Sequence, residues 1–600
     1  MEKLGSPDPA DPSQGAGLVA GVSVAKTAGV EGDEAAVSSK LFRCACVRRW
    51  LPLAYREELY HVLRLTGPLL LSRILSFLLP FVITIFCGHI GNAELAGYAL
   101  ASATINLTTT STGYGLTVAC DTLISQTFGS KNMKRVGVIL QRSSLILLLF
   151  CLPCWALLIN SYNLLSLMQQ EDEVAMFLHQ LQVTYLQNQG IILPQMYTAA
   201  AANIFNLGVN YVLIISLQLG VVGSAIANGL SQIIICLLLF AYIRWRKLHV
   251  QTWGGWSTEC LQEWGSYMKL AIPSVFMICF EWWIWEIGGF LAGSLGEVDL
   301  AAQHVILELS AITYMFPLGV YAAACVRVGN ALGAGNTARA IVTCKVSLFL
   351  SGVLAVLQGI VIASSKSVIG YIFTSDDKIV EIVSQNLTVY TFVQLFDAVL
   401  CVCSGILVGA GMQKIAAFSN LVSYYCIGLP VGIALMFAAQ LRTLGLWLGL
   451  LICVILEMGF FLVLIFKLDW KKVTRKAQMD GEEAPTTEGY SSVNTQDQEV
   501  KVVHEAEGNS TNTGGAEKDA EQSKNTAKSK PQEPLSVTQL ILRRGLTVLI
   551  SVLILAVGVG FHIAFPAPEP SAHIRANFTL NWANDSTPTP LLPLDLTTNQ

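Results

Sequence analysis

Apolar segments of about 20 residues, each followed by a short polar stretch, recur along most of this chain. A helix of that length crosses the hydrocarbon core of a lipid bilayer, which is about 30 Å thick. The twelve clear segments lie near 67–88, 95–122, 143–165, 191–217, 219–243, 269–293, 301–325, 346–372, 382–408, 416–438, 444–466 and 545–566. The pattern predicts an all-α polytopic membrane protein. It excludes a soluble enzyme, a nucleic-acid binder and a secreted disulfide scaffold.

The stretch 174–190 is a thirteenth, shorter segment that would not insert into a membrane alone. Its apolar character is diluted by six polar residues, His179, Gln180, Gln182, Thr184, Gln187 and Asn188. The basic loops at 131–142 and 244–247 can both be cytoplasmic only if an even number of crossings separates them. Because three clear segments lie between these loops, we expect 174–190 to form a fourth crossing, as a strained or packed-in helix. The alternative is a variant whose first half is incomplete.

Basic residues set the orientation of the chain, because lysine and arginine gather on the cytoplasmic side of a membrane. They cluster before the first segment, after the second and after 466, and the pair Arg543 and Arg544 precedes the last segment. The 34 residues that follow the last segment contain one arginine and no lysine. The N-terminus is therefore expected in the cytoplasm and the C-terminus outside, where Asn577 and Asn584 become candidate glycan acceptors.

The chain also repeats itself at an offset of 204 or 205 residues. The sequence Arg64-Leu-Thr-Gly-Pro68 recurs as Lys269-Leu-Ala-Ile-Pro273, and Gly129-Ser-Lys-Asn132 recurs as Gly333-Ala-Gly-Asn336. Two similar halves in the same orientation predict a parallel repeat with an axis along the membrane normal. We therefore expect two six-helix lobes around a central cavity, with one extra C-terminal transmembrane helix.

This organisation divides the chain into seven parts. The cytoplasmic N-terminal segment and the cytoplasmic tether are expected to be disordered. A linker joins the two lobes, and an extracellular tail ends the chain. In order, the parts are the N-terminal segment 1–50, the first lobe 51–250, the linker 251–268, the second lobe 269–476, the tether 477–540, the C-terminal transmembrane helix 541–566 and the tail 567–600.

Charged residues are scarce, which makes those inside the apolar segments informative. The chain is 53% hydrophobic and 13% charged, and six carboxylates lie well inside apolar segments. No lysine or arginine lies equally deep to neutralise them. A carboxylate without a counter-charge in the bilayer must be protonated or must hold a cation. The six are Asp121, Glu281, Glu286, Glu308, Asp397 and Glu457, and they favour a proton/cation exchanger.

The most informative stretch runs from Phe280 to Glu286 and contains three tryptophans. At 100° per residue, Glu281 shares a helix face with Trp285, and Trp282 shares one with Glu286. A carboxylate beside an indole offers an organic cation a charge partner and a cation–π surface.

The remaining carboxylates carry weaker predictions. Glu308 in the next segment can face the same cavity, and Asp397 comes from a third helix of the second half. Glu457 has no evident partner, and Asp121 suits either a structural hydrogen bond or a gate. Metal-ligand spacings, phosphate-binding loops and nucleophile motifs are missing from the sequence, so we expect neither a metal nor a cofactor.

Several motifs closely resemble the multidrug and toxic compound extrusion family, specifically its vertebrate branch of organic cation/proton antiporters. The resemblance runs from about residue 50 to 476 and continues in the last segment. The stretches that carry it are Cys120-Asp-Thr-Leu-Ile-Ser-Gln126, Thr252-Trp-Gly-Gly-Trp-Ser257, Glu281-Trp-Trp, Val326-Arg-Val-Gly-Asn-Ala-Leu-Gly333 and Gly428-Leu-Pro-Val-Gly432.

The resemblance implies proton and cation sites at four positions of the second half, Glu281, Glu286, Glu308 and Asp397. The family usually has a glutamate where this chain has Asp397, so the carboxylate is drawn back by one methylene. Asn106 matches an asparagine of the first-lobe cavity, and Trp285 stands where relatives often have tyrosine. Trp282 and Trp285 complete the expected substrate cavity.

The resulting hypothesis is a secondary transporter of the plasma membrane that exports organic cations in exchange for protons. Its expected partners are small organic cations, protons and membrane lipids, with no nucleic acid, and its oligomeric state is left open. A sodium-coupled exporter of the same fold is the first alternative. An intramembrane enzyme, for which Asp376-Asp377 is the nearest acidic pair, and a non-transporting variant are the others.

Overall fold

The computed structural model describes residues 52–90, 105–159, 170–373, 376–482 and 536–564. These residues form helices and contain no β-strand. The first half comprises α3 (Leu53–Ile90), the π-helix η2 (Asn106–Thr110), α5 (Ser111–Gly129), α6 (Met133–Ile159), α8 (Gln170–Asn188), α9 (Leu193–Asn210), the π-helix η3 (Tyr211–Ser216) and α10 (Gly220–Trp245).

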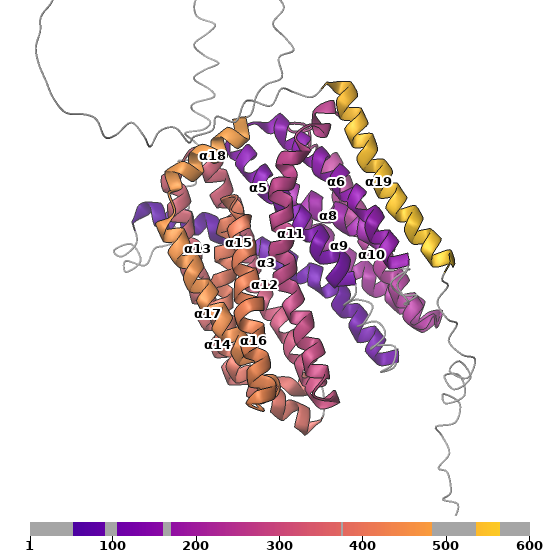
Figure 1. Ribbon diagram of the computed structural model, residues 1–600, viewed down its shortest axis with the longest axis vertical. Helices are drawn as coiled ribbons and strands as arrows, with labels where there is room; N and C mark the ends of the chain where they lie inside the picture. The colour runs from indigo at the N-terminus through magenta and orange to yellow at the C-terminus, as the bar shows by residue number, and fades with distance from the viewer. Residues whose placement is uncertain (1–51, 91–104, 160–169, 374–375, 483–535, 565–600) are drawn as a thin grey trace, which may run out of the picture.

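The second half begins with the short 3₁₀ helix η4 (Thr258–Leu261), and its long helices lie side by side (Figure 1). These are α11 (Trp264–Gly293), α12 (Glu297–Gly333), α13 (Thr337–Ser365), α14 (Asp377–Gly409) and α17 (Thr443–Lys467). The shorter elements are η5 (Ile369–Ile372), α15 (Gln413–Asn420), η6 (Leu421–Gly428), α16 (Leu429–Ile433), η7 (Ala434–Ala438) and α18 (Trp470–Glu482). The last element is α19 (Val537–Ala564).

Ten helices within the described ranges are long and apolar enough to cross a membrane, and the protein is an all-α polytopic membrane protein. They include the continuous stretch Gln413–Ala438, in which α15, η6, α16 and η7 follow one another. The predicted segment 95–122 lies partly outside the described residues. The predicted segment 191–217 forms α9 and η3, which are not among the ten.

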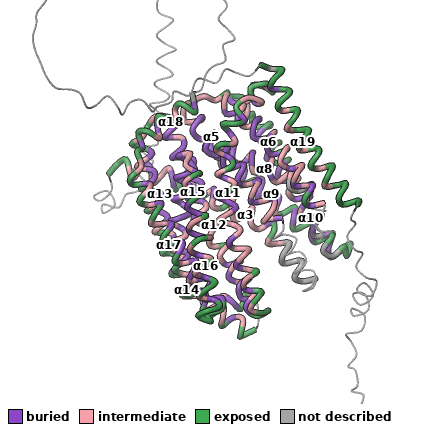
Figure 2. The backbone as a smooth tube through the Cα atoms, in the orientation of Figure 1, coloured by how far each residue is buried: buried purple, intermediate pink, exposed green. Residues whose placement is uncertain are grey.

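The polar stretch 174–190 forms most of α8, a helix of 19 residues. At 1.5 Å per residue α8 is about 28 Å long, close to the thickness of a bilayer core. It packs against α5, α6 and α10. The residues from Val183 to Asn188 are buried, and Figure 2 colours the buried backbone of the helices purple. Helix α8 is therefore packed in among neighbouring helices, as one form of the prediction expected, but it is not among the ten membrane-length apolar helices. The side chains of His179, Gln182 and Gln187 each keep a buried polar atom that has no hydrogen-bond partner among the described residues.

Repeat-related residues of the two halves meet where α5 crosses α12. A Cβ atom on Gly129 would lie 2.2 Å from the carbonyl oxygen of Asn330, and one on Gly333 would lie 1.9 Å from that of Gln126. Residues 126 and 330, like 129 and 333, differ by the repeat offset of 204. The contact is therefore reciprocal, and it requires glycine at both positions because any side chain would collide with backbone.

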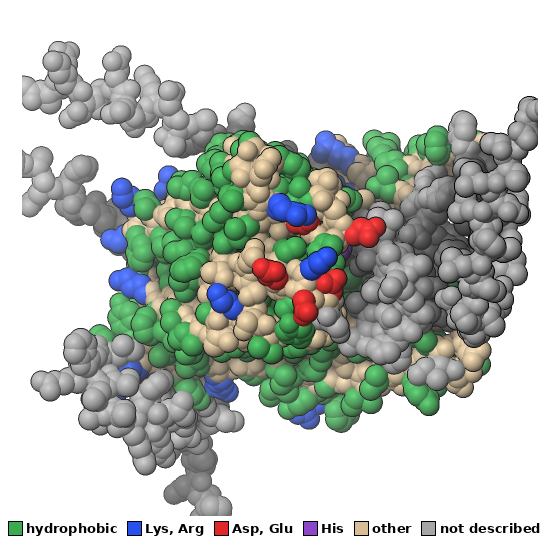
Figure 3. Space-filling view, turned by 90° about the horizontal axis from the view of Figure 1, so that it is seen from below, with side chains coloured by type: hydrophobic (Ala, Val, Ile, Leu, Met, Phe, Trp, Pro, Cys, Tyr) green, Lys and Arg blue, Asp and Glu red, His purple; other side chains and the backbone are tan. Residues whose placement is uncertain are grey.

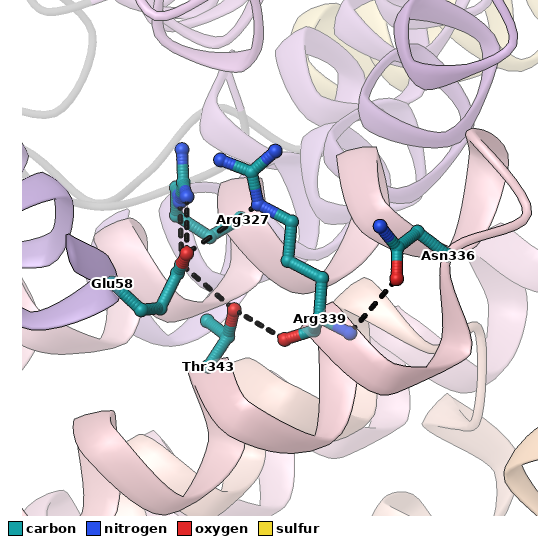
Figure 4. A network of polar contacts seen from close by, with 5 residues as sticks. All are labelled: Glu58, Arg327, Asn336, Arg339 and Thr343. Carbon is teal, nitrogen blue, oxygen red and sulfur yellow. Dashed lines mark hydrogen bonds and ion pairs between the residues drawn. The ribbon is translucent and has the colours of Figure 1, made fainter. Parts of the chain in front are cut away.

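A buried ion-pair network lies between α3 and the helices α12 and α13 (Figure 4). The carboxylate of Glu58, which is 4% exposed, accepts hydrogen bonds from Arg327 at 2.8 and 2.5 Å. Arg339 donates to the same carboxylate at 3.4 Å, and Thr343 donates at 2.8 Å. This network joins α3, the first of the described helices, to two helices of the second half.

Helix α18 lies across the same end of the molecule and contacts both halves (Figure 1). Asn132 of the first half donates to the carbonyl of Gly481 at 3.5 Å, and the hydroxyls of Thr337 and Thr474 lie 2.8 Å apart. The helix continues to Glu482 and α19 starts at Val537, so both extend into the range 477–540, which the sequence predicts to be a disordered tether. Residues 483–535 of that tether lie outside the described residues.

Helix α19 packs on the outer side of α6 (Figure 1). The guanidinium of Arg544 lies 4.3 Å from the ring centre of Trp264 and donates to the carbonyl of Leu261 at 2.9 Å. Farther along, a Cβ on Gly558 would lie 2.7 Å from the Cβ of Ala156, so the two helices approach closely. The tail 567–600, with Asn577 and Asn584, lies outside the described residues.

At the end opposite α18, acidic and basic side chains gather in the middle of the face, among apolar and uncharged surface (Figure 3). The exposed charged residues at the starts of α12, α14 and α17 are Glu297, Asp376, Asp377, Lys378 and Arg442. Arg442 pairs with the buried carboxylate of Asp299, which ties the start of α17 to the start of α12.

Candidate functional site

A small cavity inside the second half brings together two of the predicted carboxylates, Glu281 of α11 and Asp397 of α14. Its volume is about 10 Å³, which is room for about one water molecule. The described residues that line it include no basic side chain; they are Glu281, Tyr314, Asp397, Leu400, Cys401, Ser404, Asn420 and Tyr424. The cavity is therefore acidic, lined by oxygen and amide groups, and too small for an organic cation in this conformation.

The two carboxylates have different local environments. Glu281 accepts a hydrogen bond of 2.8 Å from the hydroxyl of Tyr314 on α12. Asp397 is partly buried and lies within electrostatic range of Glu281, which carries the same sign when both are ionised. Without a basic partner, two ionised carboxylates in one cavity repel each other. The arrangement therefore suits a proton or a cation that compensates at least one negative charge.

Glu286 and Glu308 do not line this cavity. Glu286 follows Glu281 by five residues on α11, which turns it by about 140° around the helix axis. Glu308 lies on α12, nearly two turns before Tyr314. Both side chains are partly buried, and neither has a hydrogen bond or an ion pair to another described residue. The structure thus brings together two of the four predicted acidic residues.

The predicted tryptophans lie on different sides of α11. Trp282 stacks on Tyr114 of α5 in the first half, with ring centres 5.5 Å apart and planes at 23°. Trp285 instead packs against Trp447 of α17, with ring centres 5.8 Å apart. Trp282 therefore lies between the two halves, whereas Trp285 belongs to an aromatic group within the second half.

Asn106 is half-buried at the start of η2, close to the same face of α11. The indole of Trp283 donates a hydrogen bond of 2.9 Å to the carbonyl of Leu107, the next residue along the chain. The π-helix η2, which begins at Asn106, therefore contacts α11 between the halves, and Asn106 is not among the described residues that line the acidic cavity.

Asp121 of α5 has a specific partner on α8. The side-chain amide of Asn188 donates to its carboxylate at 2.7 Å, and both residues are buried. Asn330 of α12 in turn donates to the carbonyl of Asn188 at 3.4 Å. These contacts give Asp121 the structural hydrogen bond that the sequence left open, at a point where three helices meet.

Six of the eight described residues that line the acidic cavity were not predicted as site residues: Tyr314, Leu400, Cys401, Ser404, Asn420 and Tyr424. All six are uncharged, so a search for charges in apolar segments passes over them. Tyr424 lies in the π-helix η6, where the backbone departs from the 3.6-residue repeat that predictions of helix faces assume. Among the described residues, no group of three or more His, Cys, Asp and Glu side chains is arranged to hold a metal ion.

Comparison with known proteins places this geometry in a family. The MatE family matches residues 68–212 and 273–434, together just over half of the chain. Multidrug and toxin extrusion protein 1 of Danio rerio is 48% identical over 539 residues, which cover 86% of this chain and 91% of that protein. The Homo sapiens protein of the same name is 45% identical over 555 residues, covering 88% and 96%.

A solved structure agrees with this assignment. The crystal structure of the eukaryotic MATE transporter AtDTX14 matches with a TM-score of 0.66 and 26% sequence identity, over 71% of this chain and 99% of that one. The family match, the similar proteins and the solved structure agree with one another. The chain belongs to the MatE family of multidrug and toxin extrusion proteins, which are multi-pass membrane transporters of small organic substrates rather than enzymes.

Proposed function

We propose that this chain exports small organic cations across the plasma membrane in exchange for protons. The observation that supports this most is the acidic cavity, in which Glu281 and Asp397 lie together without a basic residue among the described residues that line it. Its size suits a proton or a water molecule better than an organic cation. The conformation described here thus fits a proton-loaded step of the cycle.

In this mechanism the carboxylates of the second half bind cation and proton in turn. Protons that enter from outside neutralise Glu281 and Asp397 and release the cation. The state that faces the cytoplasm then loses the protons and binds the next cation. Exchange is coupled only if the site binds one or the other at a time. Trp282 and Asn106, between the halves, would contact the organic part of the substrate, and Glu286 and Glu308 would attract it.

The topology belongs to the same proposal. We infer a cytoplasmic N-terminus and an extracellular C-terminus, with the end that carries α18 in the cytoplasm. Arg135, Arg327 and Arg339 gather near that end, as the positive-inside rule requires. The division into two lobes, 51–250 and 269–476, with the linker 251–268 between them, is supported by the reciprocal contact of Gly129 and Gly333.

The test is uptake of labelled tetraethylammonium into membrane vesicles that contain the full chain. With an outward proton gradient we expect uptake that is insensitive to sodium, and E281Q and D397N should each reduce it by about tenfold or more, as loss of a buried charge partner does. The matched control is E381Q, on the same helix as Asp397 but exposed. Uptake that is unchanged by the proton gradient would contradict proton coupling.

Sodium coupling is the second candidate, because the cavity offers carboxylate, hydroxyl and amide oxygens, the ligands that hard cations prefer. Sodium coupling requires that an outward sodium gradient drive uptake, and that uptake persist without a proton gradient. A non-transporting variant was suggested only by the polar fourth segment; the packing of α8 against α5, α6 and α10 supports a transporting protein instead.

A further inference from the structure

Glu457 is a carboxylate that the proposed cycle does not yet use. It lies on α17 and is 1% exposed. Neither of its oxygens has a hydrogen-bond partner among the described residues, and the hydroxyls of Ser419 and Ser423 are its polar neighbours. An ionised carboxylate in such a place lacks both water and a counter-charge. Burial of this kind favours the neutral form of the Glu457 carboxyl group, in which it carries a proton.

The elements packed against α17 bring it acidic groups and no evident counter-charge. α14 contributes Asp397, and Glu281 acts on Glu457 from α11. η6 contributes Tyr424, and α17 itself contributes Cys453. The sequences of α16 and η7 contain no titratable residue. Three carboxyl groups thus share one part of the second half, and the ionisation of one opposes that of the others.

Tyr424 links Glu457 to the acidic cavity. Its side chain lines the cavity and lies within electrostatic range of Glu457, Asp397 and Glu281. Ser423 and Tyr424 both belong to the π-helix η6, and both are buried. π-Helical turns often occur at functional sites, because the extra residue redirects side chains. Here η6 brings the side chain of Tyr424 to the cavity and the hydroxyl group of Ser423 close to Glu457.

We propose that Glu457 is a third proton-binding group of the second half, which holds a proton while the cavity lacks a cation and releases it when a cation binds. The inference rests on the proposed exchange of organic cations for protons. A bound cation adds one positive charge to the cavity, which allows one further carboxyl group to ionise. The O–H bond of the Glu457 carboxyl group breaks, and the proton passes to water as hydronium while the carboxylate keeps the electron pair.

The experiment counts protons released when tetraethylammonium binds to the purified full chain in weakly buffered detergent solution, with a pH-sensitive dye. Wild type should release protons on binding. E457Q, which resembles the protonated residue in shape and charge, should keep binding but release about one proton fewer per bound cation, since the missing group no longer titrates. E457D should restore the release, and E381Q should match wild type.

The outcomes separate this inference from the proposed function. Binding without proton release in wild type contradicts the proposed exchange itself. Proton release that is equal in wild type and E457Q overturns the role of Glu457 alone. If E457Q does not fold, infrared difference spectra of wild type and E457D decide the question. A carboxylic-acid carbonyl band that disappears on cation binding in wild type, and shifts in E457D, supports the inference, and its absence overturns it.

Discussion

Arg327 of α12 forms a two-pronged ion pair with Glu58 of α3, with hydrogen bonds of 2.8 and 2.5 Å. The pair is largely buried and joins α3 to α12 of the second half, so it holds these two helices together. Planar guanidinium and carboxylate groups make such paired bonds strong and directional. Glu58 also accepts from Arg339 and Thr343, so it is the centre of the network.

E58Q is expected to lower the free energy of unfolding by roughly 3–5 kcal/mol, because it leaves Arg327 without its counter-charge in a buried place. The measurement is the thermal unfolding temperature of the purified protein. T343V serves as the control, since it removes one neutral hydroxyl from the same carboxylate and should cost only about 1–2 kcal/mol. Equal unfolding temperatures for wild type and E58Q would show that the ion pair contributes no stability.

G333A should disturb the contact of the two halves, because the added Cβ meets the carbonyl oxygen of Gln126 at 1.9 Å. The helices α5 and α12 must then move apart, at a cost of about 1–3 kcal/mol that is typical of overpacking. Thermal unfolding measures the loss. G459A on α17 is a matched control, since nothing lies within 4 Å of its added Cβ. A G333A protein as stable as G459A would contradict the close contact.

N188A removes the hydrogen bond of 2.7 Å to Asp121 and leaves that carboxyl group buried without its amide partner. The free energy of unfolding is expected to fall by about 1.5–3 kcal/mol, as for other hydrogen bonds to a charged group. Q180A, on the same helix and half-buried, should change the unfolding temperature little.

A short tag inserted after Gly190, which is exposed, tests whether α8 crosses the membrane. The tag should react with antibody only after cells are permeabilised, and an external tag would contradict a membrane-crossing α8.

R544A should weaken the docking of α19 on the rest of the protein, because Arg544 stacks over Trp264 at the start of α11 and donates to the carbonyl of Leu261 in η4. The stacking alone contributes about 0.5–2 kcal/mol. The cysteine pair A156C and G558C, at the closest approach of α6 and α19, reports docking by oxidative cross-linking. R544A should slow cross-linking, whereas the exposed neighbour R543A should leave its rate unchanged.

The sequence was sufficient for the helices and for part of the site. Hydropathy and the repeat predicted the segments that form α11, α12 and α14, and charges in apolar runs singled out Glu281 and Asp397. The parity of the basic loops predicts that 174–190 crosses the membrane, and the structure shows that this stretch is helical. These signals are local, because each depends on residues within one segment or on a fixed offset between segments.

Other contacts could not be read from the pattern, because they depend on how helices pack. The hydrogen bond from Asn188 to Asp121 spans 67 residues and joins side chains that look unfavourable in isolation. Tyr424 reaches the cavity through a π-helical turn, which changes the helix face without changing the hydropathy. Glu286 and Glu308 were grouped with Glu281 by type, although position around the helix axis separates them.

The reciprocal contact of Gly129 with Asn330 and of Gly333 with Gln126 has the form of an interface in a symmetric dimer. In such an interface each partner offers the same surface to the other. The two halves of this chain therefore resemble two subunits of a dimer that are joined covalently. Each glycine lacks a side chain and so allows the backbone of the opposite half to approach closely. Two half-chains produced separately should recognise each other through this surface, and a bulky residue introduced in either one should prevent their association.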